Sequence, residues 1–294
     1  MPADAAPVAV IGLGAMGSRI ATRLLSTGHA VVVWNRSREK ATPLKALGAA
    51  VADTPAAAAA NAEVVLTMVE NEAALEAVTD GPTGLVAGVR NATTIIELST
   101  VGPAGIARLS VNVPRGVHVL DAPVLGSIRE AEAGTLVMFV GGPEWLMSKH
   151  RPLLSTLGTV EHVGPLGTGA SAKLVANSTL IGALAVLAEA IALADGLGLS
   201  REATKSVLER TPLAAQAARR WTMIESGRYP ARFTLSLARK DAELIVRAAA
   251  LTNVDMRLAT ASCAWLRDAA DSGWGEHDYS ALLAHVLGQT SRRR

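Results

Sequence analysis

The segment 167–177 carries the side chains best suited to proton transfer. Gly169, Lys173 and Asn177 stand four residues apart, so on a helix they share one face. A lysine in this position could give a proton to a reacting oxygen, or take it back in the reverse direction. The amide of Asn177, one turn later, could orient the same reacting group. A single lysine on a helix is more often solvated, so the residues alone leave both interpretations open.

A glycine-rich loop at residues 12–17 has the pattern of a dinucleotide site. A short β-branched run precedes it, a helical pattern follows it, and its residues are Gly12, Leu13, Gly14, Ala15, Met16 and Gly17. We expect Gly12 to make the tight turn, Gly14 to let a pyrophosphate approach the backbone, and Gly17 to let the helix pack closely. The beginning of the helix then offers N–H groups and a partial positive charge to phosphates. The loop therefore predicts a nicotinamide dinucleotide as cofactor.

The end of the second predicted strand indicates which dinucleotide is bound. An NAD site places Asp or Glu about 20 residues beyond the glycine loop, where the carboxylate accepts hydrogen bonds from the ribose. This chain has Asn35 there, followed by Arg36, Ser37 and, further on, Lys40. A carboxylate would repel a 2′-phosphate, whereas an arginine can bind it through two hydrogen bonds. We therefore predict NADP(H), with a solvated basic loop as the alternative.

Two more polar segments follow predicted strands and could contact the cofactor or a substrate. Ser99 and Thr100 could donate hydrogen bonds into the crevice at the strand ends, although Ser-Thr before Gly-Pro is also an ordinary turn. Leu125, Gly126 and Ser127 follow a later strand. The backbone N–H groups of Gly126 and Ser127 could hold an anion such as a carboxylate.

A last candidate segment lies in a helix predicted over residues 233–251. Phe233, Leu237 and Lys240 share one face of that helix. Lys240 could reach the cofactor or the substrate, and Phe233 could line the substrate site. The alternative is a solvated Arg-Lys pair.

The pattern of strands and helices predicts how these segments are positioned. Strands are expected at 7–11, 30–34, 64–69, 93–98, 117–120 and 136–140, with helices between several of them. This alternation favours an α/β domain with a mostly parallel sheet. After about residue 169 only helices are expected, at 170–196, 201–210, 213–226, 233–251, 256–272 and 278–287. We predict two domains, an α/β domain over 1–165 and an all-α domain over 166–294.

Composition argues against several other classes of protein. The net charge is only +2 and no stripe of Lys and Arg alternates with aromatic residues, so a nucleic-acid partner is not expected. The single cysteine, Cys263, cannot form an internal disulfide, and the six histidines lack metal-ligand spacing, so no metal is expected. The apolar stretch 174–199 is interrupted by Asn177, Glu189 and Asp195, which favours a buried helix over a membrane span. We expect a cytoplasmic protein.

In combination, these segments resemble the β-hydroxyacid dehydrogenase family, which includes 3-hydroxyisobutyrate dehydrogenases and glyoxylate/succinic semialdehyde reductases. The resemblance runs from Val8 to about Leu287 and includes the run 278–282, which is similar to the family's Asp-x-Ser-Ala-Leu ending. It implies a Rossmann-like domain, a long interdomain helix, and a helical domain that assembles homodimers or homotetramers.

The resemblance also implies roles for individual residues. Lys173 matches the catalytic lysine, Asn177 the substrate-orienting asparagine, Ser99 the serine that contacts substrate and nicotinamide, and Lys240 the lysine near the cofactor. The Asn-Arg-Ser arrangement at 35–37 is most similar to that of the NADPH-using semialdehyde reductases. The expected reaction is hydride transfer between NADPH and the carbonyl of a small semialdehyde or 2-oxo acid.

Two departures from the family pattern leave alternatives open. Leu125 replaces the serine of the usual Asp-Ala-Pro-Val-Ser-Gly loop, and Ala176 replaces the first asparagine of an Asn-Asn pair. Because a leucine cannot donate to a carboxylate, a bulkier or less polar substrate becomes possible. Imine reductases share this architecture; Leu125 favours that alternative mildly and Lys173 argues against it. A dinucleotide-binding protein without enzymatic activity is the third alternative.

Overall fold

The computed structural model describes residues 7–288. The chain divides into two compact units, Met1–Lys173 and Leu174–Arg294, here called unit 1 and unit 2. The boundary between them falls within helix α9 (Thr168–Gly196). The domain division predicted after residue 165 stays a prediction.

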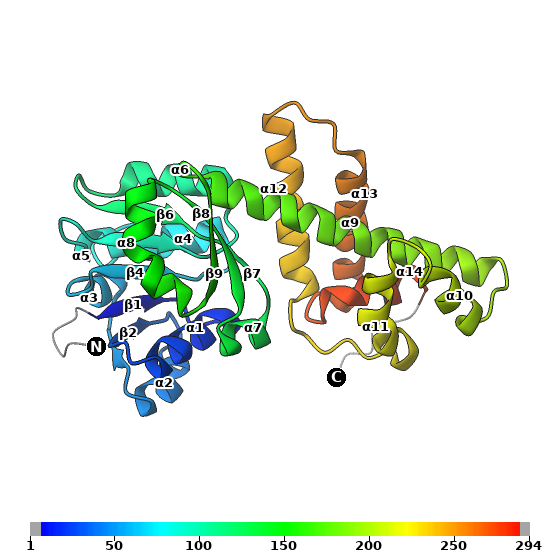
Figure 1. The fold of residues 1–294 in the computed structure, drawn as a ribbon, viewed down its shortest axis with the longest axis horizontal. Helices are drawn as coiled ribbons and strands as arrows, with labels where there is room; N and C mark the ends of the chain where they lie inside the picture. Colours follow the sequence, from blue (N-terminus) through cyan, green and yellow to red (C-terminus); the bar gives the residue numbers. More distant parts are fainter. Residues whose placement is uncertain (1–6, 289–294) are drawn as a thin grey trace. The chain divides into compact units, whose positions relative to one another are not determined.

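Unit 1 is built on a sheet that has nine strands within residues 7–288, with helices on both faces (Figure 1). The order across the sheet is β3 (Ala50–Val51), β2 (Val31–Trp34), β1 (Val8–Ile11), β4 (Val64–Thr67), β5 (Thr94–Glu97), β6 (His118–Asp121), β8 (Leu136–Gly141) and β7 (Val124–Leu125), with β9 (Gly158–Gly164) paired to β8. β8 runs antiparallel to β6 and β7, while the other pairs are parallel. The predicted α/β class with a mostly parallel sheet is confirmed.

Each face of this sheet has its own hydrophobic core. In β1, Val8 and Val10 pack in one cluster while Ala9 and Ile11 pack in the other, because successive side chains of a strand point to opposite faces. The first face is covered by α1 (Ala15–Ser26), α2 (Thr42–Ala46), α7 (Ile128–Ala133) and α8 (Glu144–Ser155), and the second by α3 (Pro55–Ala59), α4 (Glu72–Thr79), α5 (Leu85–Gly88) and α6 (Gly102–Asn112). Burial on both faces explains why these strands are continuous apolar runs.

Three strands are absent from the prediction made on sequence. β3 and β7 have only two residues each, too few to produce a hydrophobic period. β9 is longer, but most of its residues are exposed or half-buried, and it contains Glu161 and His162. Its pairing with β8 holds these polar residues in a strand, a tertiary effect that the local pattern does not reveal.

Unit 2 is built from helices, as predicted. Besides its part of α9 it contains α10 (Arg201–Leu208), α11 (Ala214–Ser226), α12 (Leu235–Leu251), α13 (Arg257–Ala269) and α14 (Leu282–Val286), with two short helical segments at Ala270–Trp274 and Tyr279–Ala281. The predicted start of α12 at Phe233 is wrong. Thr234 caps this helix, its Oγ1 accepting a hydrogen bond from the Leu237 N–H at 3.3 Å, so Phe233 precedes the helix and does not share a helical face with Lys240.

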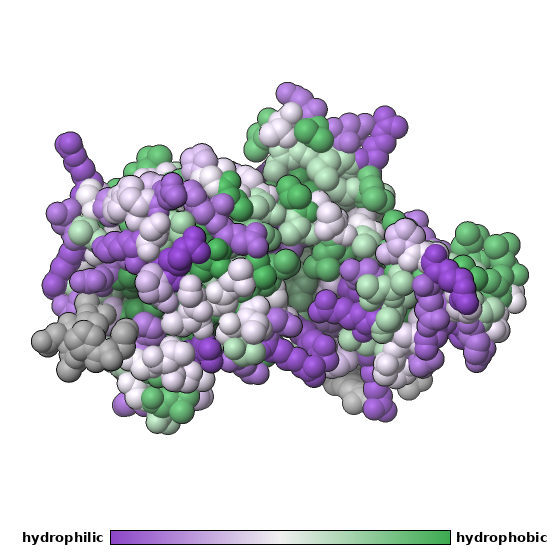
Figure 2. Space-filling view, in the orientation of Figure 1, coloured by the Kyte–Doolittle hydropathy of each residue, from purple (hydrophilic) through white to green (hydrophobic). Residues whose placement is uncertain are grey.

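Helix α9 is apolar on more than one face. Ile181, Leu184 and other buried residues of α9 form much of the unit 2 core. Leu193 and Leu197 near its end are exposed, as is Val207 of α10, and Figure 2 shows hydrophobic residues gathered over this end of α9 and α10. By length and composition α9 could cross a membrane, and 50% of its most apolar window is buried inside the structure. The buried part of that window belongs to the core of unit 2.

Candidate functional site

The glycine loop lies where the strand order reverses between β1 and β4, the position at which such sheets bind ligands. Gly12 has a φ of +97°, and a Cβ added there would lie 2.3 Å from the Met68 carbonyl oxygen. A Cβ at Gly17 would lie 2.0 Å from the Gly12 carbonyl oxygen. Around Gly14 an added Cβ meets nothing within 4 Å. The first two glycines are therefore required by backbone packing, and Gly14 borders open space.

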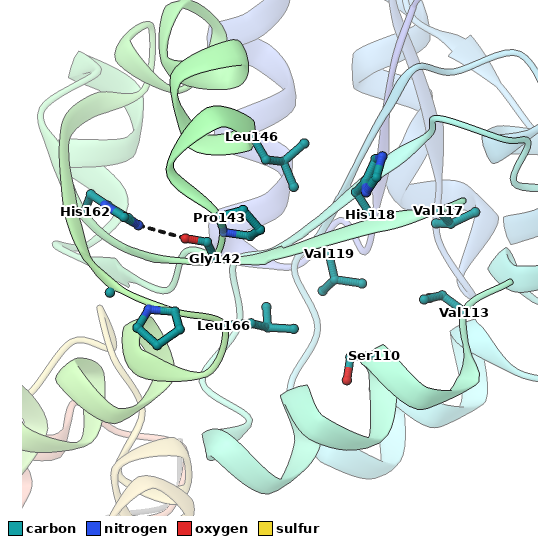
Figure 3. A pocket seen from close by; sticks show the side chains of 12 residues that line it. Ser110, Val113, Val117, His118, Val119, Gly142, Pro143, Leu146, His162 and Leu166 are labelled. Atoms are coloured by element: carbon teal, nitrogen blue, oxygen red, sulfur yellow. Dashed lines mark hydrogen bonds between the residues drawn. The ribbon is translucent and has the colours of Figure 1, made fainter. Parts of the chain in front are cut away.

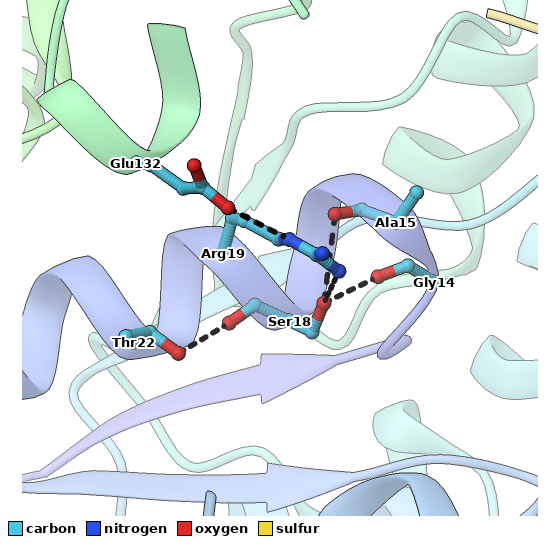
Figure 4. A network of polar contacts seen from close by, with 6 residues as sticks. All are labelled: Gly14, Ala15, Ser18, Arg19, Thr22 and Glu132. Atoms are coloured by element: carbon cyan, nitrogen blue, oxygen red, sulfur yellow. Dashed lines mark hydrogen bonds and ion pairs between the residues drawn. The ribbon is translucent and has the colours of Figure 1, made fainter. Parts of the chain in front are cut away.

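Helix α1 begins at this loop without a side-chain cap. The first N–H groups of a helix have no partner within it and attract anions, and Gly14 and Ala15 are exposed here. The Ser18 hydroxyl donates to the Gly14 carbonyl oxygen at 2.8 Å, and Arg19 pairs with Glu132 of α7 at 3.3 Å (Figure 4). Side chains thus tie the first turn of α1 to α7, and the backbone N–H groups remain for a ligand.

Asn35 holds the glycine loop from the end of β2. Its Oδ1 accepts a hydrogen bond from the Leu13 N–H at 2.8 Å, and its Nδ2 donates to the Ser37 carbonyl oxygen at 3.0 Å. Both polar atoms of Asn35 are therefore used to fix the loop. Arg36 and Lys40 are exposed on the segment that follows. Their guanidinium and ammonium groups are positive charges that this segment offers to an anion, whereas Arg38 between them pairs with Asp53.

Ser99 lies buried after β5 and joins two loops. Its Oγ accepts a hydrogen bond from the Val69 N–H at 2.8 Å. A hydroxyl that accepts in this way can still donate its own hydrogen, and Thr100 beside it is half-buried. Glu97, which was not predicted as a site residue, is a fully buried carboxylate that accepts hydrogen bonds from the Ser99 N–H at 2.7 Å and from the Thr67 hydroxyl. A charged residue at the end of an apolar strand was the available signal.

The 125–127 loop differs from its prediction. Leu125 is half-buried in β7 and Gly126 is exposed, with a φ of +135°. Ser127 caps α7, and its N–H donates to Glu130 Oε2 at 2.8 Å in a capping box. The prediction that the Ser127 N–H is presented to an anion is wrong for this conformation, because Glu130 already occupies that N–H.

Asp121, which the sequence analysis also missed, anchors the beginning of α9. It is fully buried at the end of β6, and its two carboxylate oxygens accept from the N–H groups of Gly167 at 2.8 Å and Ala170 at 2.6 Å. Burial raises the pKa of this carboxyl group, and the backbone hydrogen bonds oppose that rise. Gly169 passes so close to β8 that an added Cβ would lie 2.3 Å from a backbone oxygen. The first turn of α9 is therefore fixed.

Lys173 and Asn177 lie one turn apart on α9, as predicted. Lys173 is only 9% exposed and Asn177 is 2% exposed. The alternative of a solvated surface lysine is therefore wrong. A lysine and an amide buried on the same helix form an unusual pair, because both groups must be compensated by polar partners.

A buried carboxylate on α12 holds Asn177. The Asn177 Nδ2 donates to Asp241 Oδ2 at 2.7 Å, and the Lys240 ammonium lies 2.8 Å from Asp241 Oδ1. Asp241 is 2% exposed, and its charge is compensated by Lys240, whose side chain is 22% exposed. Lys240 was predicted as a site residue from the sequence, and Asp241 was not. The Lys-Asp dipeptide was visible, whereas its contact with a residue 64 positions away was not.

A cavity of about 600 Å³ in unit 1 lies away from these residues. It is formed where β6 begins, at Val117 and His118, with Leu146 of α8 and His162 of β9 on other sides (Figure 3). His162 Nε2 donates to the Gly142 carbonyl oxygen at 2.8 Å within it. The predicted site residues of unit 1 follow strand ends instead, and none of them lines this cavity.

Unit 1 therefore provides backbone N–H groups and basic side chains suited to a phosphorylated cofactor, and α9 carries a buried lysine and amide suited to proton transfer. Within residues 7–288, no three His, Cys, Asp or Glu side chains are grouped so that they could hold a metal ion.

Both halves of the chain match known families. Residues 7–167 match the NAD-binding domain of 6-phosphogluconate dehydrogenase, and residues 167–286 match the NAD-binding domain of NADP-dependent 3-hydroxyisobutyrate dehydrogenase. A 2-(hydroxymethyl)glutarate dehydrogenase from Eubacterium barkeri is 31% identical over 280 residues, covering 94% of this chain and 93% of the relative. The chloroplastic glyoxylate/succinic semialdehyde reductase 2 of Arabidopsis thaliana is 29% identical over 289 residues, covering 97% and 80%.

Solved structures give the same assignment. A 3-hydroxyisobutyrate dehydrogenase from Mycobacterium tuberculosis, solved with L-serine, has a TM-score of 0.84 at 28% identity, covering 96% of this chain and 99% of that chain. An imine reductase from Myxococcus stipitatus with NADP+ has a TM-score of 0.65 at 22% identity, covering the same shares. The second likeness concerns the fold alone.

Proposed function

The chain belongs to the β-hydroxyacid dehydrogenase family, and we propose that it is an NADP(H)-dependent oxidoreductase acting on a small semialdehyde or 2-oxo acid. A nicotinamide cofactor and dehydrogenase or reductase activity follow from the family; the choice of NADP(H) and the roles of individual residues are the proposal. The observation that carries it is the burial of Lys173 one turn before Asn177, on a helix whose first turn is fixed by Asp121.

The residues of unit 1 fit a dinucleotide. The uncapped beginning of α1 and the open space beside Gly14 would hold the pyrophosphate. Arg36, Ser37 and Lys40 would hold the 2′-phosphate. Asn35 occupies the position at which an NAD site has a carboxylate, a group that would repel this phosphate. Both polar atoms of Asn35 bind other groups of the chain. When bound, the cofactor supplies a hydride to the carbonyl carbon of the substrate.

Lys173 would act as the general acid in reduction. Its ammonium group donates a proton to the carbonyl oxygen, which becomes the hydroxyl of the product, and the neutral amine takes the proton back in oxidation. Asn177 would orient the substrate beside Lys173. Ser99, with its Oγ fixed by the Val69 N–H, would contact the substrate and the nicotinamide through its own hydrogen.

One observation favours a second candidate, reduction of an imine. Two hydrogen-bond donors that could bind a substrate carboxylate are missing from the 125–127 loop. Leu125 has an apolar side chain in place of the family's serine, and the Ser127 N–H already donates to Glu130. An imine substrate needs no carboxylate. Lys173 could pass its proton to a nitrogen as well as to an oxygen, although by the resemblance a lysine at this position argues against an imine reductase.

The experiment that tests the proposal is a substrate panel with both cofactors. Oxidation of NADPH and of NADH is followed by absorbance with short semialdehydes, 2-oxo acids and cyclic imines. We expect turnover of a carbonyl compound, with kcat/KM for NADPH above that for NADH. Equal or better use of NADH would refute the NADP(H) preference. Turnover of imines alone would replace the proposal with imine reduction, and dinucleotide binding without any turnover would favour a non-enzymatic protein.

We also propose a homodimer that associates through unit 2. Exposed apolar side chains at the end of α9 and on α10, including Leu193, Leu197 and Val207, support this arrangement (Figure 2). Val207 also lines a groove of about 490 Å³ together with Val186 and Ala190 of α9. Light scattering after size exclusion should give twice the chain mass. A monomer at micromolar concentration would refute it.

A further inference from the structure

Glu97 is a buried carboxylate to which the proposed reaction gives no role. It is the last residue of β5, and it is fully buried beside Thr67, its register partner at the end of β4. Its Oε1 accepts a hydrogen bond from the Ser99 N–H at 2.7 Å, and its Oε2 accepts one from the Thr67 hydroxyl. Donors on both oxygens favour the ionised form of a carboxyl group. Glu97 therefore places a negative charge at the end of β5.

A second buried acid makes this charge more costly to keep. Asp121, the last residue of β6, is the register partner of Glu97 and is also fully buried. Adjacent strands lie about 5 Å apart, and register partners have their side chains on the same face of the sheet. Two acids in such positions disfavour each other's ionised form, and a positive charge bound nearby offsets that cost.

The other half of the same sheet edge carries positive charge. Arg36 and Lys40 are exposed on the segment that follows β2, and the strand order there is β2, β1, β4, β5. A dinucleotide lies across the position at which the strand order reverses, with its two halves on the two sides. Because residues 35–40 are proposed to hold the adenosine half, the nicotinamide half extends toward the ends of β4 and β5. Glu97 therefore lies on the nicotinamide side of the glycine loop.

We propose that Glu97 is a specificity-determining residue, whose buried charge makes the site favour the oxidised dinucleotide by attracting the positively charged nicotinamide ring. The inference rests on the proposed position of the dinucleotide. The oxidised ring carries one positive charge and the reduced ring carries none, while the phosphate groups are the same in both forms. Charges in a protein interior interact over several ångströms, so the carboxylate acts without touching the ring.

Glu97 also has a structural function, which must be separated from its charge. It connects Ser99 to β4 through Thr67, and Ser99 Oγ accepts a hydrogen bond from the Val69 N–H at 2.8 Å. Displacement of Ser99 would weaken the binding of both forms of the dinucleotide alike. The ammonium group of Lys173, which is buried at the beginning of α9, has the opposite charge but is the same in all the variants below. The ratio of the two dissociation constants therefore isolates the charge of Glu97.

The first measurement compares both forms of the cofactor in Glu97→Gln. The glutamine oxygen can accept from the Ser99 N–H while its NH₂ group donates to the Thr67 hydroxyl, so this variant removes the charge and keeps the connection. Isothermal titration calorimetry gives Kd for NADP+ and for NADPH. We expect the ratio of Kd for NADP+ to Kd for NADPH to rise by at least about threefold, since unit charges several ångströms apart interact at this level even at the dielectric constant of water. An unchanged or lower ratio, including equal weakening of both forms, would overturn the proposal.

Three variants serve as controls for this ratio. Glu63→Gln makes the same substitution at an exposed residue just before β4, at the opposite end of that strand, and should keep the wild-type ratio. Glu97→Asp keeps the charge on a shorter side chain, so its ratio should stay within about twofold of wild type even where both constants change. A ratio like that of Glu97→Gln would contradict the role of charge. Should Glu97→Gln fail to fold, Glu97→Met combined with Thr67→Val removes the charge together with its hydroxyl partner, and the same rise is expected.

A ligand without the nicotinamide distinguishes this inference from the proposed function. Adenosine 2′,5′-bisphosphate contains only the phosphorylated half, so its Kd should be equal for wild type and Glu97→Gln. A changed value would mean that the substitution acts beyond the nicotinamide half and would overturn the proposal. Failure of this ligand to bind to wild type would instead refute the proposed 2′-phosphate site. The ratio of Kd for NAD+ to Kd for NADH would then test Glu97 in the same way.

Discussion

The glycine loop and the Asn177–Asp241–Lys240 cluster are built in opposite ways. The loop places backbone groups at the beginning of α1, and its glycines at 12 and 17 leave no room for a Cβ. The cluster places a carboxylate, an amide and an ammonium group around one buried position, from helices α9 and α12. A binding site made of backbone groups therefore depends on the room left by small residues. A site made of buried side chains depends on which polar atom of each side chain faces its neighbour.

The largest effect is expected from Lys173→Ala, which should impair turnover without changing cofactor binding at the glycine loop. Lys173→Ala should lower kcat by about a hundredfold or more, because the general acid is lost. The dissociation constant of NADPH should remain near the wild-type value, since the proposed pyrophosphate site consists of backbone groups. Steady-state kinetics and a fluorescence titration with NADPH measure the two effects. Lys45→Ala, at an exposed position of α2, is the control, and activity near wild type in Lys173→Ala would contradict the assignment.

A pair of alanine substitutions sharpens the description of the loop. Gly17→Ala places a methyl group against the Gly12 carbonyl oxygen and should lower the free energy of unfolding by about 1–3 kcal/mol. Gly14→Ala meets nothing within 4 Å, so stability should hardly change, while the methyl group enters the space proposed for the pyrophosphate and weakens NADPH binding. Urea unfolding and NADPH titration of both variants check this. Normal NADPH binding by Gly14→Ala would place the pyrophosphate elsewhere.

Arg36 tests whether a side chain adds specificity to the backbone site. Arg36→Glu puts a carboxylate where the 2′-phosphate is proposed to bind, so the ratio of kcat/KM for NADPH to that for NADH should fall by about tenfold, or about 1.4 kcal/mol. The value for NADH in the same variant serves as the internal control. An unchanged ratio would mean that Arg36 is only a solvated residue of the loop.

The smallest effect concerns a buried titratable group outside both regions. His150 is 5% exposed and hydrogen-bonded to the Thr94 hydroxyl at 2.9 Å; burial, with Lys149 and His118, lowers its pKa from 6.5 to about 4. Between pH 6.5 and pH 4 the unfolded chain binds a proton at this histidine and the folded chain does not. The free energy of unfolding therefore decreases as the pH is lowered. From pH 7 to about pH 5.5 we expect a loss of about 1 kcal/mol. Urea unfolding of wild type and His150→Gln checks it, and identical pH profiles would contradict the assignment.

The sequence predicts the strands that are buried on both faces and fails for the others. β1 and α1 follow from an apolar run and a helical period within 20 residues, and the segment between them has the glycine pattern of a nucleotide loop. β7 and β9 depend on pairing with β8, which no local pattern encodes. The start of α12 was misplaced because Phe233 is apolar and continues the helical period, while Thr234 supplies the cap.

For the candidate site too, residues in local motifs were predicted and residues that act through contacts between distant segments were not. Gly12 lies in the loop between β1 and α1, and Lys173 lies one turn before Asn177 on α9, as the motifs predict, because these positions follow from spacing along the chain. Their roles in binding and catalysis stay predictions. Glu97, Asp121 and Asp241 were missed, because each carboxylate acts through a hydrogen bond to another segment. Ser127 was assigned a free N–H that Glu130 occupies, although the capping-box spacing is present in the sequence.

By itself, the sequence determined the family, the mostly parallel sheet followed by helices, and the positions of the glycine loop and Lys173, since all of these are recorded in residue types at short spacing. Only the tertiary structure decided that Lys173 is buried, that Asp121 fixes the start of its helix, and that Asp241 turns the amide of Asn177. The physical reason is that hydrogen-bond direction and burial depend on atoms brought together from distant parts of the chain.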